Sequence, residues 1–327
     1  MRITLLLLVL ALSFLALALS LNPRSSAKTL ETRCSSAKGL QLDLERVIPT
    51  PYTISPLDFA RITDTTFLAL TRAGEIHILR SGESKAKSLG KTVMNGIEAG
   101  HGQLLAFTDQ QFYRFDESVG KWRLFNIPVN RDRIRAAESS PSGSVLWTIT
   151  SGGGQYVVRG FRITPQTEFK AEETQHWGFP RAVRMTSVSN ERLVVASVRP
   201  PFQIQELTFG SDPVEMTEVT IEEIENRTAG TILATNLVTL DCNSVVLILA
   251  ELESNTRWIT VIDMHIGRIK SQVRVKATMS FFDSDPKNRR LFSYHETNRG
   301  GEVLVYRWTW ISKSVGEMQT DAKRREP

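Results

Sequence analysis

Short apolar runs separated by turn residues fill the chain from residue 40 to residue 310, and stretches with a helical period are nearly absent there. The runs are rich in Val, Ile, Leu, Phe, Thr, Tyr and Trp, and they are bounded by Gly, Pro, Asn, Asp and Ser. This pattern is typical of β-strands. The sequence therefore predicts an all-β fold for residues 40–310.

One phrase recurs along this region: an apolar run, a tight turn, and a second apolar or aromatic run. Its six copies start at Phe67, Leu104, Val145, Leu193, Val245 and Leu291. Successive starts lie 37, 41, 48, 52 and 46 residues apart. Because a four-stranded propeller blade takes roughly 40–50 residues, the spacing predicts a six-bladed β-propeller. A two-sheet β-sandwich is the alternative architecture.

The strands around each copy predict how the ring closes. An apolar run before most copies is expected to be the innermost strand, and a polar run after each of the first five is expected to be the outermost. The sixth copy ends at Trp310 without a fourth strand, whereas residues 39–47 alternate Leu with polar residues and belong to no copy. We expect this N-terminal strand to pair with the strand that contains Val303, Val305 and Arg307, because that pairing covers an open edge.

The N-terminus predicts export. Residues 3–21 carry no charge and follow Arg2, which is typical of the hydrophobic helix of a secretory signal peptide and is also long enough for an uncleaved membrane anchor. Either interpretation predicts a secreted or extracytoplasmic protein, which contacts the membrane only through residues 3–21 if they stay uncleaved. The expected organisation is a signal peptide or anchor at 1–21, a linker at 22–39, the propeller at 40–310 and a polar tail at 311–327.

An oxidising compartment would permit a disulfide between the chain's 2 cysteines, Cys34 and Cys242, and two unpaired thiols are the alternative. Asn226 begins the sequon Asn-Arg-Thr, which predicts glycosylation in a eukaryotic secretory pathway. The formal charge of +5 comes from 40 basic and 35 acidic residues. Much of this excess lies near the chain ends, and no basic stripe is interleaved with aromatic residues, so we expect no nucleic-acid partner.

Several segments resemble known propeller families. DFARITDTTFLALTRAGEIHIL and GIEAGHGQLLAFTDQQFYRF resemble repeats of the regulator-of-chromosome-condensation type, and FYRFDESVGKWRLFNIP is similar to a kelch blade. Six blades behind a secretory signal also resemble the lactonase and strictosidine-synthase-like propellers. This last resemblance implies a metal or substrate site at one end of the central channel.

No local motif commits the chain to a reaction. None of the 5 histidines lies at metal-ligand spacing or beside a cysteine pair, so we expect no metal and no cofactor. A Gly-x-Ser-x-Gly elbow is also absent from the sequence. The candidate ligand-face residues are those near the ends of the predicted innermost strands, where loops converge on the channel: Asp58, Glu98, His101, Asp132, Arg181 and Asp283.

The mixed charge of these residues suits a polar or cationic ligand, although they would also satisfy one another in ion pairs. The leading hypothesis is a scaffold that binds a protein partner or a small polar ligand at a propeller face. The alternative is an extracellular propeller enzyme, lactonase-, synthase- or cyclase-like, with its site at the channel mouth. A membrane-complex subunit held by an uncleaved 3–21 helix is a third hypothesis.

Overall fold

The computed structural model describes these residues: 39–50, 56–83, 86–91, 94–100, 103–127, 132–163, 171–208, 217–219, 232–253, 256–264, 267–276, 281–297 and 300–311. All of them belong to the compact unit Ser35–Pro327. Four expected features lie outside them: the hydrophobic segment 1–21, Cys34, His101 and Asn226. Every regular element in the described ranges is a β-strand, and no helix there is long and apolar enough to cross a membrane.

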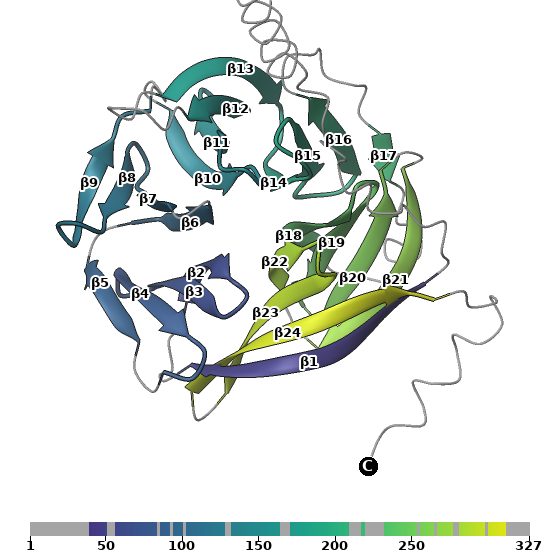
Figure 1. Ribbon diagram of the computed structural model, residues 1–327. Coiled ribbons are helices and arrows are strands. Elements are labelled where there is room, and N and C mark those ends of the chain that lie inside the picture. Colours follow the sequence, from purple (N-terminus) through teal and green to yellow (C-terminus); the bar gives the residue numbers. More distant parts are fainter. Residues whose placement is uncertain are drawn as a thin grey trace, which may run out of the picture. The chain divides into compact units, whose positions relative to one another are not determined.

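The described residues form 24 strands in six four-stranded sheets, and all the strand pairs are antiparallel. Figure 1 shows the sheets arranged around a common centre, which one edge strand of each sheet faces. The prediction of an all-β, six-bladed propeller is confirmed.

The first three sheets follow the chain from the innermost to the outermost strand. Sheet 1 consists of β2 (Pro56–Thr63), β3 (Thr66–Thr71), β4 (Glu75–Arg80) and β5 (Lys87–Lys91). Sheet 2 consists of β6 (Gly96–Gly100), β7 (Gln103–Phe107), β8 (Phe112–Asp116) and β9 (Lys121–Phe125). Sheet 3 consists of β10 (Arg133–Ser139), β11 (Val145–Gly152), β12 (Gln155–Ile163) and β13 (Ala171–Phe179).

The next two sheets repeat this order. Sheet 4 consists of β14 (Val183–Ser187), β15 (Arg192–Ser197), β16 (Phe202–Thr208) and β17 (Thr217–Val219). Sheet 5 consists of β18 (Ile232–Asp241), β19 (Ser244–Glu251), β20 (Thr256–Asp263) and β21 (Arg268–Lys276).

Sheet 6 joins segments from the two ends of the described chain. Its first three strands are β22 (Phe281–Asp285), β23 (Arg290–Thr297) and β24 (Gly300–Trp310), and its outermost strand is β1 (Leu40–Thr50). β1 runs antiparallel beside β24, as the purple and yellow arrows of Figure 1 show. The register places Asp43 opposite Arg307 and Ile48 opposite Val303, with an irregularity between Leu44 and Arg46.

Each junction between neighbouring sheets contains one cluster of buried apolar side chains, six clusters in all among the described residues. The period of two along a strand produces this arrangement, because successive side chains point to opposite faces of the sheet. On β15, Val194 and Ala196 pack toward sheet 5, whereas Leu193 and Val195 pack toward sheet 3. Sheet 4 therefore buries both of its faces against neighbours.

The junction between sheets 6 and 1 depends on β1. Ile48 is 1% exposed and packs in one cluster with Phe292 and Val303 of sheet 6 and with Phe67 and Leu79 of sheet 1. β1 thus supplies hydrophobic contacts at this junction as well as the backbone hydrogen bonds to β24.

Replacing Ile48 by alanine should lower the free energy of unfolding by about 2–5 kcal/mol, because the change removes buried methyl groups and leaves a cavity. Val47 is the matched control: it is the next residue on the strand and is 44% exposed, so Val47→Ala should change stability by only about 0.5 kcal/mol. Chemical denaturation of both variants measures the difference. Equal effects would show that Ile48 does not anchor this junction.

Candidate functional site

Every innermost strand presents at least one polar side chain to the neighbouring sheet near the centre of the ring. We call this set the polar belt; its members are Asp58, Glu98, Glu138, Arg184, Asn236 and Asp283, on β2, β6, β10, β14, β18 and β22 respectively. Each member forms a hydrogen bond across a junction between two sheets. The belt therefore links all six innermost strands through polar contacts.

At three junctions a carboxyl group accepts a hydrogen bond from a backbone N–H of the next innermost strand. These bonds run from Ile97 N to Asp58 Oδ2 at 3.0 Å, from Ser139 N to Glu98 Oε1 at 3.2 Å, and from Ser187 N to Glu138 Oε1 at 3.0 Å. The carboxyl groups thus supply acceptors to backbone N–H groups of the neighbouring strand, which matters because a buried N–H without a partner is costly.

At the next two junctions a side chain donates instead. Arg184 Nε donates to the carbonyl oxygen of Ala234 at 3.5 Å, and Asn236 Nδ2 donates to that of Phe281 at 2.5 Å. The bond from Arg184 is at the limit of hydrogen-bond length. At the same junction Thr239 Oγ1 donates to the Ser187 carbonyl oxygen at 3.1 Å.

An arginine completes the last junction. Arg61 of β2 donates from Nε to Asp283 Oδ2 at 2.6 Å and from Nη2 to the Ser284 carbonyl oxygen at 3.0 Å. Its Nη1 also lies 3.3 Å from Asp64 Oδ1 and 3.7 Å from Asp285 Oδ2. The guanidinium of Arg61 is thus surrounded by acceptors.

Burial at the centre raises the pKa values of the belt carboxyl groups, because the charged form loses water. Burial raises the pKa of Asp58 to about 6 and that of Glu138 to about 8. Burial, and then the neighbouring Glu138 carboxylate, raise the pKa of Glu98 well above its ordinary value. Burial also raises the pKa of Asp283, against the opposing effect of Arg61. At neutral pH the Glu138 carboxyl therefore stays largely protonated, whereas that of Asp58 is largely ionised.

Three of the residues that the sequence analysis selected lie together in the belt: Asp58, Glu98 and Asp283. Asp132 lies elsewhere, paired with Arg159 Nη2 at 2.9 Å. Arg181 lies outside the belt as well, with Nη1 donating to the Pro200 carbonyl oxygen at 3.0 Å. Whether any of these residues binds a ligand stays a prediction, and His101 lies outside the described residues.

The sequence analysis did not single out the other belt members, Glu138, Arg184 and Asn236. All three lie on innermost strands, namely β10, β14 and β18. No signal in the sequence distinguishes them, because the same strands carry further polar residues, such as Arg135, Thr186 and Thr235. No group of three His, Cys, Asp or Glu in the described ranges is arranged to hold a metal ion.

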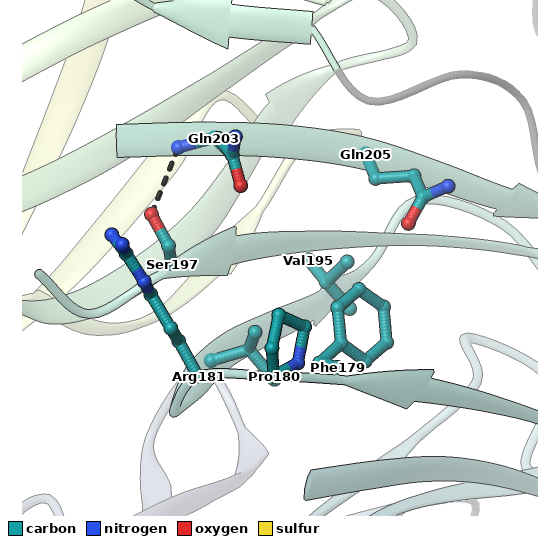
Figure 2. A pocket seen from close by; sticks show the side chains of 8 residues that line it. Phe179, Pro180, Arg181, Val195, Ser197, Gln203 and Gln205 are labelled. Atoms are coloured by element: carbon teal, nitrogen blue, oxygen red, sulfur yellow. Dashed lines mark hydrogen bonds between the residues drawn. The ribbon is translucent and has the colours of Figure 1, made fainter. Parts of the chain in front are cut away.

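A small pocket lies between the end of β13 and sheet 4. Its floor is apolar and buried, formed by Phe179, Val183 and Val195. Figure 2 shows Arg181 at one side of it and Gln203 on the strand opposite. Arg181 is exposed, so the pocket is accessible from solvent.

Ser197 fixes the pocket wall beside Gln203. Its Oγ accepts a hydrogen bond from the Gln203 backbone N–H at 2.8 Å, drawn as a dashed line in Figure 2, and donates to the Pro201 carbonyl oxygen at 3.0 Å. The loop between β15 and β16 is thereby held against the strands. The pocket combines a rigid apolar floor with a polar rim.

No protein-family model and no curated protein matches the chain by sequence. Among solved structures, the PQQ-bound aldose sugar dehydrogenase of Streptomyces coelicolor is similar at a TM-score of 0.51 and 13% identity, over 83% of this chain and 99% of that one. The β-propeller domain of Myceliophteria thermophila Cps50 (Swd1) is similar at a TM-score of 0.51 and 12% identity, over 79% and 84%. U3-55K is similar at a TM-score of 0.50 and 10% identity, over 77% and 80%. At these identities the likeness shows the β-propeller fold alone.

The raised pKa of Glu138 predicts how stability depends on pH. The folded carboxyl keeps its proton up to about pH 8, whereas its unfolded value is 4.5. Between these values the unfolded state binds fewer protons, so the free energy of unfolding falls as the pH rises. Glu138→Gln keeps an acceptor oxygen for the Ser187 N–H but cannot ionise, and it should make this fall shallower in chemical denaturation across that range.

Glu117→Gln is the control for this experiment, because Glu117 is exposed in the turn between β8 and β9. Its pH profile should match that of the wild type. If Glu138→Gln follows the wild-type profile too, the folded carboxyl does not retain its proton.

Proposed function

We propose that this propeller is a non-enzymatic binding scaffold for a protein partner, and that the pocket between β13 and sheet 4 receives one side chain of that partner. The observation that carries the proposal is the combination of a buried apolar floor with an exposed polar rim. Residues that dominate binding energy at protein interfaces insert into such well-packed pockets.

The rim defines the chemistry of the partner. Arg181 places an exposed cation beside the apolar floor, and its guanidinium keeps free N–H donors besides the one bound to Pro200. An acidic residue of the partner would form a charge-assisted bond there, which is stronger than a neutral hydrogen bond. The expected partner segment therefore carries an aromatic or aliphatic anchor next to Asp or Glu.

Export belongs to the same proposal. An uncharged run behind Arg2 would deliver the propeller out of the cytoplasm as a secreted or membrane-anchored protein. There a Cys34–Cys242 disulfide and glycosylation at Asn226 become possible. Cys242 lies in the turn between β18 and β19, and no described cysteine is free. Cys34 and Asn226 lie outside the described residues.

Peptide-display selection on the immobilised full chain tests the binding function. Selected peptides should share an apolar anchor beside an acidic residue, and Arg181→Glu should weaken their binding roughly 10- to 100-fold, because it replaces a charge-assisted bond by repulsion. Arg199→Glu is the matched control, since Arg199 is also exposed, lies on the neighbouring loop and does not line the pocket. Failure to enrich any peptide, or equal binding by both variants, would contradict the proposal.

The mature N-terminus tests the proposed export. Protein purified from the cells that make it should begin near residue 19, 21 or 28 if small residues direct cleavage, or keep Met1 in a membrane fraction if the segment is an anchor. An intact Met1 in a membrane-free cytosolic fraction would refute export. Peptide mapping without reductant, on the same material, should show Cys34 linked to Cys242.

A further inference from the structure

Arg184 is the one cation of the belt, and its charge has no ion-pair partner within 4 Å in the part of the chain that the structure describes. Its one hydrogen bond is the 3.5 Å contact from Nε to Ala234. Arg61, by contrast, contacts Asp283, Asp64 and the Ser284 carbonyl oxygen. The two Nη groups of Arg184, which form the fork of the guanidinium, are therefore available to a ligand.

The Arg184 side chain is open to solvent and at the same time partly enclosed by protein. Its side chain is exposed between two buried neighbours on β14, Val183 and Met185. Burial nevertheless lowers the pKa of its guanidinium, and the negative charge of Asp58 opposes that effect. Arg184 is thus both exposed to solvent and enclosed by protein. We infer that it lies in a confined opening between the innermost strands.

Asp58 faces Arg184 across the ring. It lies on sheet 1 and Arg184 on sheet 4, and sheets three places apart in a ring of six lie opposite each other. Asp58 receives N–H bonds from Phe59 at 3.0 Å and from Ile97 at 3.0 Å. A carboxylate offers about four acceptor positions, so two remain for a donor supplied by a ligand.

The remaining belt acids do not compete for Arg184. Asp283 is paired with Arg61 at 2.6 Å. Burial raises the pKa values of Glu98 and Glu138, that of Glu138 to about 8, and so favours the neutral form of these two carboxyl groups. The centre of the ring therefore presents one cation, Arg184, and one opposing anion, Asp58, without ion-pair partners among the described residues.

We propose that the centre of the ring binds a small zwitterionic amino acid, with its carboxylate on the guanidinium fork of Arg184 and its ammonium group on Asp58. The planar fork matches a carboxylate in a bidentate arrangement. A zwitterion supplies both missing partners at once, which neither a simple anion nor a simple cation does. The site is separate from the pocket of the proposed function, because Val183 lines that pocket and the adjacent Arg184 points to the other face of β14.

Calorimetry and thermal shift of the full chain with a series of zwitterions test this inference. The series contains the free L-α-amino acids, β-alanine and 4-aminobutyrate, which differ in the distance between the ammonium and carboxylate groups. Each is compared with the carboxylate that lacks the amine and with the amine that lacks the carboxylate. At least one zwitterion should bind one to one and raise the melting temperature, and its two singly charged analogues should bind about tenfold more weakly or worse.

Variants identify the site. Arg184→Gln should weaken binding at least about tenfold, and Arg184→Lys, which keeps the charge but loses the fork, should give an intermediate loss. Arg135→Gln is the matched control, because Arg135 is an exposed arginine on the neighbouring innermost strand whose Nε is bound to Ser151 at 2.7 Å. Binding by Arg135→Gln should equal that of the wild type.

Three results would overturn the inference. They are the absence of binding by every zwitterion, equal binding by a singly charged analogue, and equal binding by Arg184→Gln and Arg135→Gln. Circular dichroism establishes whether the variants are folded. If Arg184→Gln is not folded, binding by Arg184→Lys is compared with binding by Arg135→Gln. Peptide binding that depends on Arg181 is measured separately, so either binding function can fail without the other.

Discussion

The packing of every sheet between two neighbours is the constraint on which the rest of this structure depends. A strand such as β15 is apolar on both sides, so its sheet is buried only when another sheet covers each face. A row of such sheets leaves two apolar faces open unless the row closes on itself. Sheet 6 meets this requirement with β1 from one end of the described chain and β24 from the other, and the Ile48 cluster covers the face of sheet 1.

The same packing creates the chemistry at the centre. Six innermost strands converge there, and the polar groups beside them lose bulk water, so the belt supplies hydrogen bonds between strands that no sheet ladder joins. Lost hydration also raises the pKa of Glu138 to about 8. Arg184, the one cation of the belt, has no ion-pair partner among the described residues, and for that reason the proposed ligand is placed there.

The sequence predicted the strands and their count because both depend on local alternation: Leu193, the start of one repeat, lies in β15, and the leftover strand at residue 39 corresponds to β1. It also predicted that Asp58, Glu98 and Asp283 lie near the centre. The sequence did not distinguish these three residues from Asp132 or Arg181, which lie outside the belt. Periodicity identifies a strand, but it does not identify the junction between sheets that a side chain of that strand reaches. Arg181 lies at a strand start like Arg184, yet it lines the pocket, and only the three-dimensional arrangement distinguishes the two.

Native-state hydrogen exchange, followed by peptide mass spectrometry across a denaturant series, tests the central claim that the six sheets form one closed and cooperative ring. The account predicts that protected amides in β3, β11, β19 and β23 exchange through a single opening with a common free energy, because no sheet keeps both faces covered once a neighbour is lost. Separate openings of sheets 1–3 and sheets 4–6, with different free energies, would contradict it.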